Sequence, residues 1–483
     1  MHPRSLSPNL KTRRRKRLNL PLPSHNRRLA WLSIAFFTLL ALTGWYGSAR
    51  ALSIEKEREL GQEFAANIKA HFPLLHDEFC QTYIETLGHL ICKQLRVQPF
   101  PFHFYIIKQN ELNAFAGPGG HVFFYTGLIC SMDNVDELAG VLAHEMGHVA
   151  ARHISKRIEQ GKKLSIATMA AVLAGILVGG QAGAALSTGS VAAGIQAQLH
   201  YSRQDERQAD QLGFKYASNA GFRPTGLIDA LKIIQKNSWM RSNSVPPYML
   251  THPTGPERIA NLESMAKSFI PRRNDVVEAL RRDFPVFKTI VQAKSQDPDE
   301  LVQLYKQELR AGKEVALAHL GLGIAYKRKS EYSLSARHLE AALKDMPVSL
   351  PIWLELGEDY QLIGENRKAI ALFEKVLEKR PGDARAALLL ANSYENIGEY
   401  EKAISLLKRL TFSTKATPQV YYQLGMSYGR LKKLAQAHYY FGMYFKKLGR
   451  LQKARFHFIE AKRLSKGDTA LQRKIARESK GIL

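Results

Sequence analysis

Two histidines that could hold a metal ion, His144 and His148, stand four residues apart within an apolar stretch, 138–149. The apolar residues of that stretch recur with the helical period, so both histidines should lie on one face of a helix. Zn²⁺ accepts neutral imidazole nitrogens, and a catalytic zinc takes three protein ligands and leaves a fourth position for water. Glu145 could accept the proton of that water. This HExxH spacing predicts one zinc ion per chain, with Glu145 as general base; the simpler alternative is a helix whose histidines only pack or cap.

The third ligand has to come from farther along the chain. Ile154 stands where a metzincin would have its third histidine, and His153 is one residue off that register, so we expect it to point away from the metal. A later helical stretch, 201–221, carries Glu206 and Asp210 four residues apart and therefore on one face. Glu206 suits the third ligand, and Asp210 suits the second shell, where it would accept the N–H of a ligand histidine. The alternative is an ordinary solvated charged face.

Four segments together resemble peptidase family M48. In chain order they are NAFAGPGGHVFFYTGLI (113–129), HEMGHVAARH (144–153), ERQAD (206–210) and THPTGPERI (251–259). The resemblance covers about residues 55–265 and implies an α+β zincin-like (gluzincin) metalloprotease domain, mostly helical with a small sheet. It also implies that His252 can reach the open position of the zinc and keep the enzyme latent until a substrate displaces it. By the same resemblance, Arg258 stabilises the tetrahedral oxyanion.

Two stretches ahead of the HExxH motif, 102–108 and 121–126, read as short strands, with a Gly-Pro-Gly-Gly turn before the second. In a zincin the substrate lies along the edge of such a sheet as an added strand held by main-chain hydrogen bonds. The resemblance places that substrate-binding edge at five consecutive residues, Asn113, Ala114, Phe115, Ala116 and Gly117. The alternative is a plain hairpin.

A 34-residue period appears in the C-terminal half. Leucine recurs at 322, 356, 390 and 424, and tyrosine recurs at 326, 360, 394 and 428. This period is typical of tetratricopeptide repeats, in which each helical hairpin buries the face of its neighbour. We therefore predict an all-α repeat solenoid over residues 299–468, joined to a peptidase domain (52–265) by a connecting region (266–298) and followed by a C-terminal tail (469–483).

The N-terminal segment, 1–51, is a candidate signal peptide. Its first 28 residues carry nine Lys and Arg and no acid, residues 29–46 are apolar, and Ala49-Arg50-Ala51 offers a cleavage site. An uncleaved anchor in the inner membrane, with the chain facing the periplasm, is the alternative. A second region, 164–197, is apolar and then rich in Gly, Ala and Ser, which fits either a hairpin on a membrane surface or a buried helical pair.

The chain is strongly basic, with a formal net charge of +26, and removal of residues 1–51 leaves +16. Such a balance favours contact with anionic membrane surfaces or acidic clients. The sequence shows no nucleic-acid-binding module, and its basic residues are spread along the chain, so we expect no nucleic-acid partner.

These features together predict a zinc-dependent endopeptidase whose substrates are polypeptides. The resemblance extends to periplasmic members of the family in Gram-negative bacteria that work in the quality control of outer-membrane proteins. It implies misfolded outer-membrane proteins as clients and an assembly-machinery protein as a partner of the repeats. The alternative function is a chaperone or scaffold whose protease site is latent or secondary; the presence of Glu145 favours the enzyme.

Overall fold

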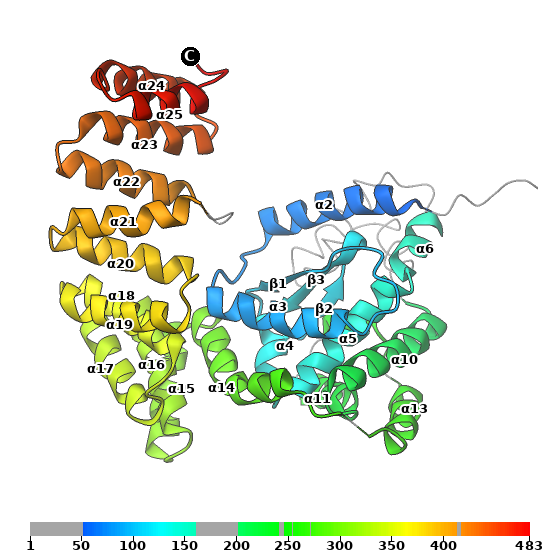
Figure 1. Ribbon diagram of the computed structural model, residues 1–483. Helices are drawn as coiled ribbons and strands as arrows, with labels where there is room; N and C mark the ends of the chain where they lie inside the picture. The colour runs from blue at the N-terminus through cyan, green and yellow to red at the C-terminus, as the bar shows by residue number, and fades with distance from the viewer. Residues whose placement is uncertain (1–51, 161–200, 241–245, 254, 271, 413–416) are drawn as a thin grey trace, which may run out of the picture. The chain divides into compact units, whose positions relative to one another are not determined.

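The computed structural model describes residues 52–483 apart from 161–200, 241–245, 254, 271 and 413–416 (Figure 1). The predicted signal segment (1–51) and the region 164–197 therefore lie outside the described residues. Within the described ranges, no helix combines the length and the apolar character needed to cross a membrane.

The part that precedes the repeats is mostly helical and encloses one small sheet. Its elements are α2 (Ile54–His71), α3 (Glu78–Cys92), β1 (His103–Ile107), β2 (Ala114–Ala116), the 3-10 turn η1 (Pro118–Gly120), β3 (His121–Tyr125), α4 (Thr126–Ser131), α5 (Val135–Ala150), α6 (His153–Gln160), α10 (Arg203–Ala220), α11 (Gly226–Met240), α12 (Pro247–Thr251) and α13 (Pro256–Lys267). The strand order is β1-β3-β2, with β1 parallel and β2 antiparallel to the central strand. Both predicted strands are thus present as β1 and β3, and β2 forms one edge of the sheet.

Helix α5 carries the HExxH motif through the middle of the core. Asn134 caps it by accepting hydrogen bonds from the backbone N–H groups of Asp136 and Glu137, whose acidic side chains suit the positive end of the helix. Helix α10 begins with a capping box between Ser202 and Asp205 and is followed by the C-cap residue Gly221, which has a φ of 104°. The caps therefore determine the residue at which each helix begins. The first residue in turn determines which side chains of each helix face the other helix.

Two glycines let α5 and α10 approach until their backbones touch. A Cβ on Gly147 of α5 would lie 2.8 Å from the carbonyl oxygen of Ala209 in α10. A Cβ on Gly213 of α10 would lie 2.7 Å from the backbone nitrogen of His144 in α5. Any side chain at either position would push the helices apart, and the histidines of α5 face the carboxylates of α10 across this contact.

The remainder of the described chain is helical hairpins in sequence order (Figure 1). The helices are α14 (Asp275–Ser295), α15 (Pro298–Arg310), α16 (Val315–Arg328), α17 (Tyr332–Asp345), α18 (Leu350–Leu362), α19 (Asn366–Lys379), α20 (Ala384–Asn396), α21 (Tyr400–Thr411), α22 (Pro418–Arg430), α23 (Leu434–Lys447), α24 (Leu451–Leu464) and α25 (Thr469–Glu478). The predicted fold class, a mostly helical domain with a small sheet followed by a repeat solenoid, is confirmed. Residues 469–478, expected as part of a tail, form α25, which buries Leu471 and Ile475.

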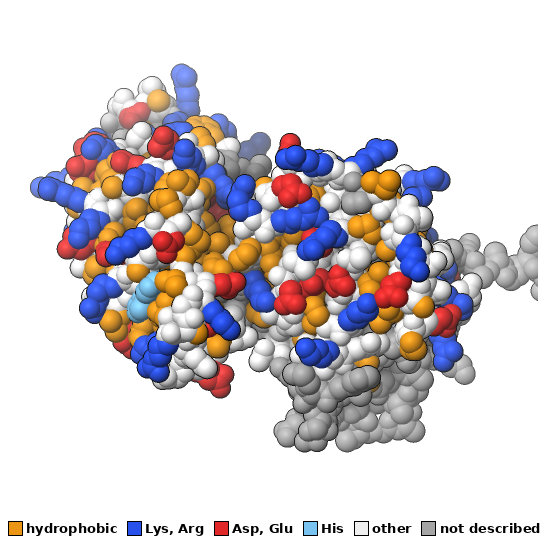
Figure 2. Space-filling view, turned by 90° about the horizontal axis from the view of Figure 1, so that it is seen from below, with side chains coloured by type: hydrophobic (Ala, Val, Ile, Leu, Met, Phe, Trp, Pro, Cys, Tyr) orange, Lys and Arg blue, Asp and Glu red, His pale blue; other side chains and the backbone are white. Residues whose placement is uncertain are grey.

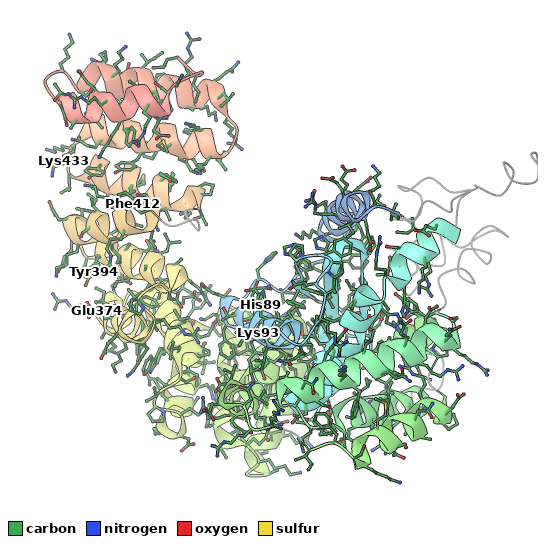
Figure 3. All side chains as sticks on the ribbon, turned by 45° about the vertical axis from the view of Figure 1, so that its right-hand side comes forward. His89, Lys93, Glu374, Tyr394, Phe412 and Lys433 are labelled. Atoms are coloured by element: carbon green, nitrogen blue, oxygen red, sulfur yellow. The ribbon has the colours of Figure 1, made fainter. Side chains whose placement is uncertain are left out.

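The leucine and tyrosine columns of the repeat have structural roles. All four leucines of the column are at most 4% exposed. The hydroxyl of Tyr360 donates to Glu340 at 2.6 Å, and one repeat later Tyr394 donates to Glu374 at 2.7 Å (Figure 3). The period therefore sets both the core and a repeated hydrogen bond between helices.

Substitution of Gly213 by alanine is expected to weaken zinc binding as well as folding. The added methyl group would overlap the backbone of α5, and such overpacking costs about 1–3 kcal/mol. Relaxation would separate the histidines from the carboxylates, so we expect a lower melting temperature and a lower zinc affinity in a chelator competition. Gly382→Ala, in a repeat turn where a Cβ would meet nothing within 4 Å, is the control. Unchanged zinc affinity in Gly213→Ala would contradict the role assigned to this contact.

Candidate metal centre

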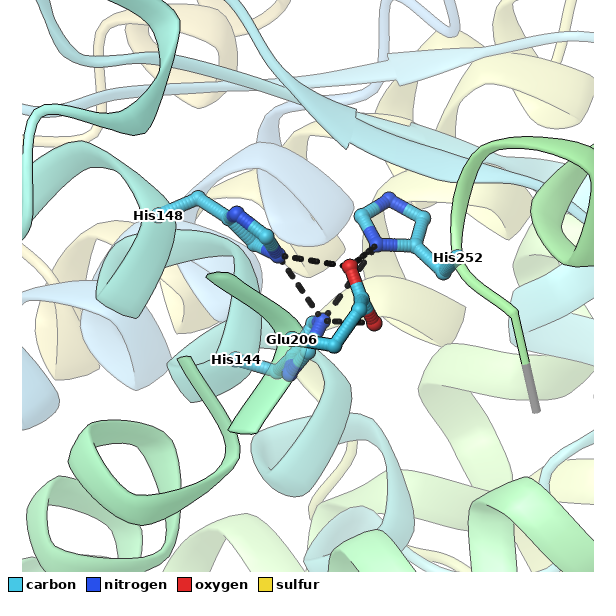
Figure 4. A group of neighbouring side chains, drawn as sticks. All are labelled: His144, His148, Glu206 and His252. Carbon is cyan, nitrogen blue, oxygen red and sulfur yellow. Dashed lines mark hydrogen bonds and ion pairs between the residues drawn. The ribbon is translucent and has the colours of Figure 1, made fainter. Parts of the chain in front are cut away.

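Four side chains from three separate elements converge on one point in the core (Figure 4). His144 and His148 come from α5, Glu206 comes from the first turn of α10, and His252 follows α12. Each is at most 1% exposed, and one ligand atom from each lies within 4.8 Å of the other three. The structure thus brings the three predicted ligands together and adds the residue predicted to occupy the open position.

The spacing of these atoms fits a tetrahedral zinc ion. The Nε2 atoms of His144 and His148 are 3.1 Å apart, and each lies 3.4–3.6 Å from an oxygen of Glu206. His252 Nδ1 lies 3.4 Å from His144 Nε2 and 3.0 Å from a Glu206 oxygen. A tetrahedral zinc with bonds of about 2.0–2.1 Å separates its ligands by about 3.3–3.4 Å. The four residues therefore match the size and the donor chemistry of a zinc site.

A second set of contacts orients the imidazoles. Asp210 lies 2.9 Å from His144 Nδ1, the contact expected of a carboxylate that accepts the N–H of a ligand histidine. On the other imidazole, His153 Nδ1 lies 3.0 Å from His148 Nδ1, while His153 Nε2 lies 3.0 Å from Gln208. His153 is not one of the four converging residues, in agreement with the expectation that it points away from the metal. It contacts Nδ1 of His148, on the other side of that ring from the atom that faces the ligand set. With Nδ1 so engaged in both histidines, the two Nε2 lone pairs face the same point.

Arg258 lies against the carboxylates of α10. Its Nε and Nη2 donate to the two oxygens of Asp210 at 2.8 and 2.7 Å, and its Nη1 is 2.6 Å from Glu206 and donates to the Pro253 carbonyl at 3.0 Å. These contacts engage most of the guanidinium donors. The geometry therefore favours Arg258 as a positioning residue for Glu206 and Asp210, while its role at an oxyanion stays a prediction from the family resemblance.

The charges of the site follow from burial and from these contacts. Burial lowers the pKa of His148 well below its usual value, which leaves a neutral imidazole able to bind metal. Burial alone would raise the pKa of Glu206, but the nearby His252, His148 and Arg258 outweigh it and hold that pKa well below its usual range. Burial raises the pKa of Glu145, which makes it a stronger proton acceptor than a surface glutamate.

The edge strand β2 reaches the same site. Tyr125 N–H donates to the Asn113 carbonyl, and Gly117 N–H donates to the His121 carbonyl, so the main-chain groups of 113, 115 and 117 face β3. Because the pairing alternates along an antiparallel strand, the main-chain groups of Ala114 and Ala116 point to the outer edge. Strand β2 packs against α5, the helix that carries Glu145. The predicted substrate-binding strand therefore runs beside the predicted general base.

Two tyrosines that were not predicted from the sequence line the site. Tyr201 packs on His148, with ring centroids 3.8 Å apart, and Tyr248 stacks on His252 at 4.6 Å. Both tyrosines are at most 7% exposed. No spacing in the sequence links them to the HExxH motif, because they lie about 50 and 100 residues beyond it and reach it only through the fold. Their rings pack against the imidazole rings of His148 and His252 and restrict the orientation of those rings.

Comparisons with known proteins give the same two-part organisation. Residues 80–266 match the model of peptidase family M48, and residues 364–424 match a tetratricopeptide-repeat model. A β-barrel assembly-enhancing protease from Yersinia pestis is 31% identical over 330 residues, which is 66% of each chain. The protein of that name from Escherichia coli strain K12 is 32% identical over 224 residues, 46% of each chain. The chain thus spans between about half and two thirds of the length of these relatives.

Likeness to solved structures is slight. A crystal structure of MamA protein is 21% identical, with a TM-score of 0.29, and the match covers 35% of this chain and 93% of that one. A similarity at this level has no bearing on the site.

The Arg258→Gln variant separates the two roles considered for this arginine. If Arg258 positions Glu206 and Asp210, its loss should lower zinc affinity about 10- to 100-fold, as is usual for residues behind metal ligands. Zinc affinity is measured by competition with a fluorescent chelator. Arg207→Gln, which removes an exposed arginine paired with Glu257, is the control and should bind zinc like the unchanged chain. Full zinc affinity with a large loss of kcat would instead assign Arg258 to the oxyanion.

Proposed function

Because the chain belongs to peptidase family M48 over residues 80–266 and carries tetratricopeptide repeats, we propose that it is a zinc-dependent endopeptidase acting on polypeptides in the cell envelope. The observation that carries this proposal is the convergence of His144, His148 and Glu206 on one point, with Glu145 beside it. Three ligands plus a neighbouring carboxylate base are the components that metal-assisted hydrolysis of an amide requires.

The residues of the site have distinct roles in this reaction. His144, His148 and Glu206 would hold one Zn²⁺, which would supply a Lewis acid that lowers the pKa of water and polarises a carbonyl. Glu145 accepts the proton of the attacking water and returns it to the leaving amine. Asp210 keeps His144 in the tautomer that presents Nε2 inward, and Arg258 keeps both acidic residues in place.

The substrate would enter as an extended strand along β2. The outward main-chain groups of Ala114 and Ala116 offer a donor and acceptor row for an added antiparallel strand. Asn113, Phe115 and Gly117 hold that row against β3. Since β2 packs against the helix that carries Glu145, a peptide paired there passes near the general base. Recognition through the main chain suits an enzyme that takes unfolded segments of many sequences.

His252 is proposed as a latch on the site. Its Nδ1 occupies the fourth corner of the ligand set, and its Nε2 lies 3.6 Å from Glu145. A histidine in that corner excludes the water and the substrate carbonyl that catalysis needs there. His252 and the adjoining helix α12 would have to move to clear it, and a substrate strand on the neighbouring edge could drive that movement.

For the biological setting we propose protein quality control in the periplasm of a Gram-negative bacterium. Relatives named β-barrel assembly-enhancing protease support misfolded outer-membrane proteins as clients, and the repeats support binding of clients or of an assembly-machinery protein. Residues 1–51 would direct export, as a signal peptide or an inner-membrane anchor. A latched protease could also act as a chaperone or scaffold through its repeats, which is the second candidate function.

Glu145→Gln is the decisive variant for the enzymatic proposal. The amide keeps the size of the side chain but cannot accept the proton, so cleavage of a loosely folded protein should fall by about 10² or more. Zinc content should remain one per chain, measured by plasma emission spectrometry. Glu257→Gln, the same change at an exposed position, should cleave normally. Equal cleavage by the Glu145→Gln chain would contradict the proposal, and absence of zinc after metal is restored would refute the metal site itself.

The latch makes a prediction in the opposite direction. His252→Ala should raise the initial rate of casein cleavage several-fold, because the fourth position is then open before substrate arrives. His71→Ala, at an exposed position, should leave the rate unchanged. A fall in rate for His252→Ala, with zinc content intact, would show that His252 assists catalysis rather than blocking it. If neither the unchanged chain nor His252→Ala cleaves while both carry zinc, the scaffold function is favoured.

A further inference from the structure

Two consecutive parts of the repeat solenoid differ strongly in net charge. Residues 299–412 contain 17 Lys and Arg and 17 Asp and Glu, so this part has no net charge. Residues 417–483, which form α22 to α25, contain 15 Lys and Arg and three Asp and Glu, a net charge of +12. Little more than a third of the solenoid thus carries nearly all of its charge imbalance, which the packing of the repeats does not require.

The positive charges of α22 to α25 are largely unneutralised. Glu478 pairs with Lys446 and Arg477, Glu460 pairs with Arg463, and Asp468 caps α25. Among the described residues, the other 12 basic side chains have no carboxylate within ion-pair distance. All 12 are exposed. Lys433, in the turn before α23, lies at the outer margin of the stacked helices (Figure 3). On the face shown in Figure 2, by contrast, positive and negative side chains are interspersed.

Apolar side chains stand among these charges on one face of α24. Positions 452, 455, 456, 459 and 463 share that face by helical spacing. Phe456 is 58% exposed and Ile459 is 46% exposed, although both have the character of core residues. Arg455 and Arg463 lie on the same face, and Lys462 lies beside it. A helix face that combines solvent-exposed large apolar residues with positive charge is typical of segments that lie at a membrane surface.

The end of a solenoid needs a polar cap, but a cap does not explain this composition. A capping helix must avoid further stacking, which mixed charges achieve equally well. It also gains nothing from exposed Phe456 and Ile459, which would promote association in water. An anionic bilayer accounts for both features, because phosphates attract the cations while the apolar side chains enter the headgroup region.

We propose that helices α22 to α25 dock the protein on a membrane surface rich in anionic phospholipid, with the exposed face of α24 in contact with the headgroups. Phe456 and Ile459 enter the interface, and Arg455, Lys462 and the neighbouring cations bind lipid phosphates. This surface is separate from the metal centre, so the outcome of its test does not depend on whether the chain cleaves peptides.

The test is binding of the full chain to vesicles of phosphatidylcholine, with and without phosphatidylglycerol, measured by co-sedimentation. The unchanged chain should bind the anionic vesicles much more tightly and should lose binding as salt is added. Arg455→Glu combined with Lys462→Glu should weaken binding at least about tenfold, since each cation near an anionic surface increases the affinity several-fold. Phe456→Ser with Ile459→Ser should remove the binding that remains at high salt.

The matched control is Lys313→Glu with Arg337→Glu, which makes the same charge change at exposed positions of the neutral part, 299–412. It should bind vesicles almost as well as the unchanged chain. Circular dichroism melting and zinc content verify that all variants are folded. Equal binding to neutral and anionic vesicles, or equal binding by the α24 variant, would overturn the proposal. Tight binding of polyglutamate without binding to vesicles would overturn it in favour of an acidic protein partner.

Discussion

The backbone contact between α5 and α10 is the constraint on which the site depends. Neither helix carries a complete set of ligands, so the metal centre exists only where His144 and His148 meet Glu206 across the helix interface. That meeting requires an approach closer than any side chain at 147 or 213 would permit. Glycine inside a helix destabilises that helix relative to alanine. Burial of the flanking apolar residues of α5, several of which are fully inaccessible to solvent, compensates for this loss of stability. The core therefore stabilises a geometry that the two helices alone would not favour.

Electrostatics explains why this geometry needs a cation. With their Nδ1 atoms engaged by Asp210 and His153, the ligand histidines direct lone pairs toward the oxygens of Glu206. Acceptors at 3.1–3.6 Å repel one another strongly in a buried site of low dielectric constant. Arg258 neutralises part of the negative charge from outside the ligand set, and a divalent ion would neutralise the rest from within. The arginine and the metal thus act on the same carboxylate from opposite sides.

Much of this organisation was predictable because it is periodic. Helical spacing alone places His144 with His148 and Glu206 with Asp210, and the 34-residue period identifies the repeats; the family matches confirm the combination of an M48 domain with tetratricopeptide repeats. The contact of His153 with His148 was not predicted, because it forms beyond the end of α5. The helix stops at Ala150, and Arg152 adopts a left-handed conformation with a φ of 54°, which turns His153 back toward His148. The contacts of Arg258 and Tyr201 depend on tertiary folding, for which no local pattern exists.

The proposed latch and the proposed edge strand impose a joint requirement on substrates. Displacing His252 removes a buried histidine from contacts with His144 and Glu206, and that step is unfavourable unless something compensates. Hydrogen bonds to the free edge at Ala114 and Ala116 are the available compensation, and only a segment with unpaired main-chain groups can form them. A folded protein has its strands already paired and gains little by entering. An unfolded β-rich chain exposes such segments along its length, so the same two features that restrain the enzyme would select the clients for which a quality-control protease is needed.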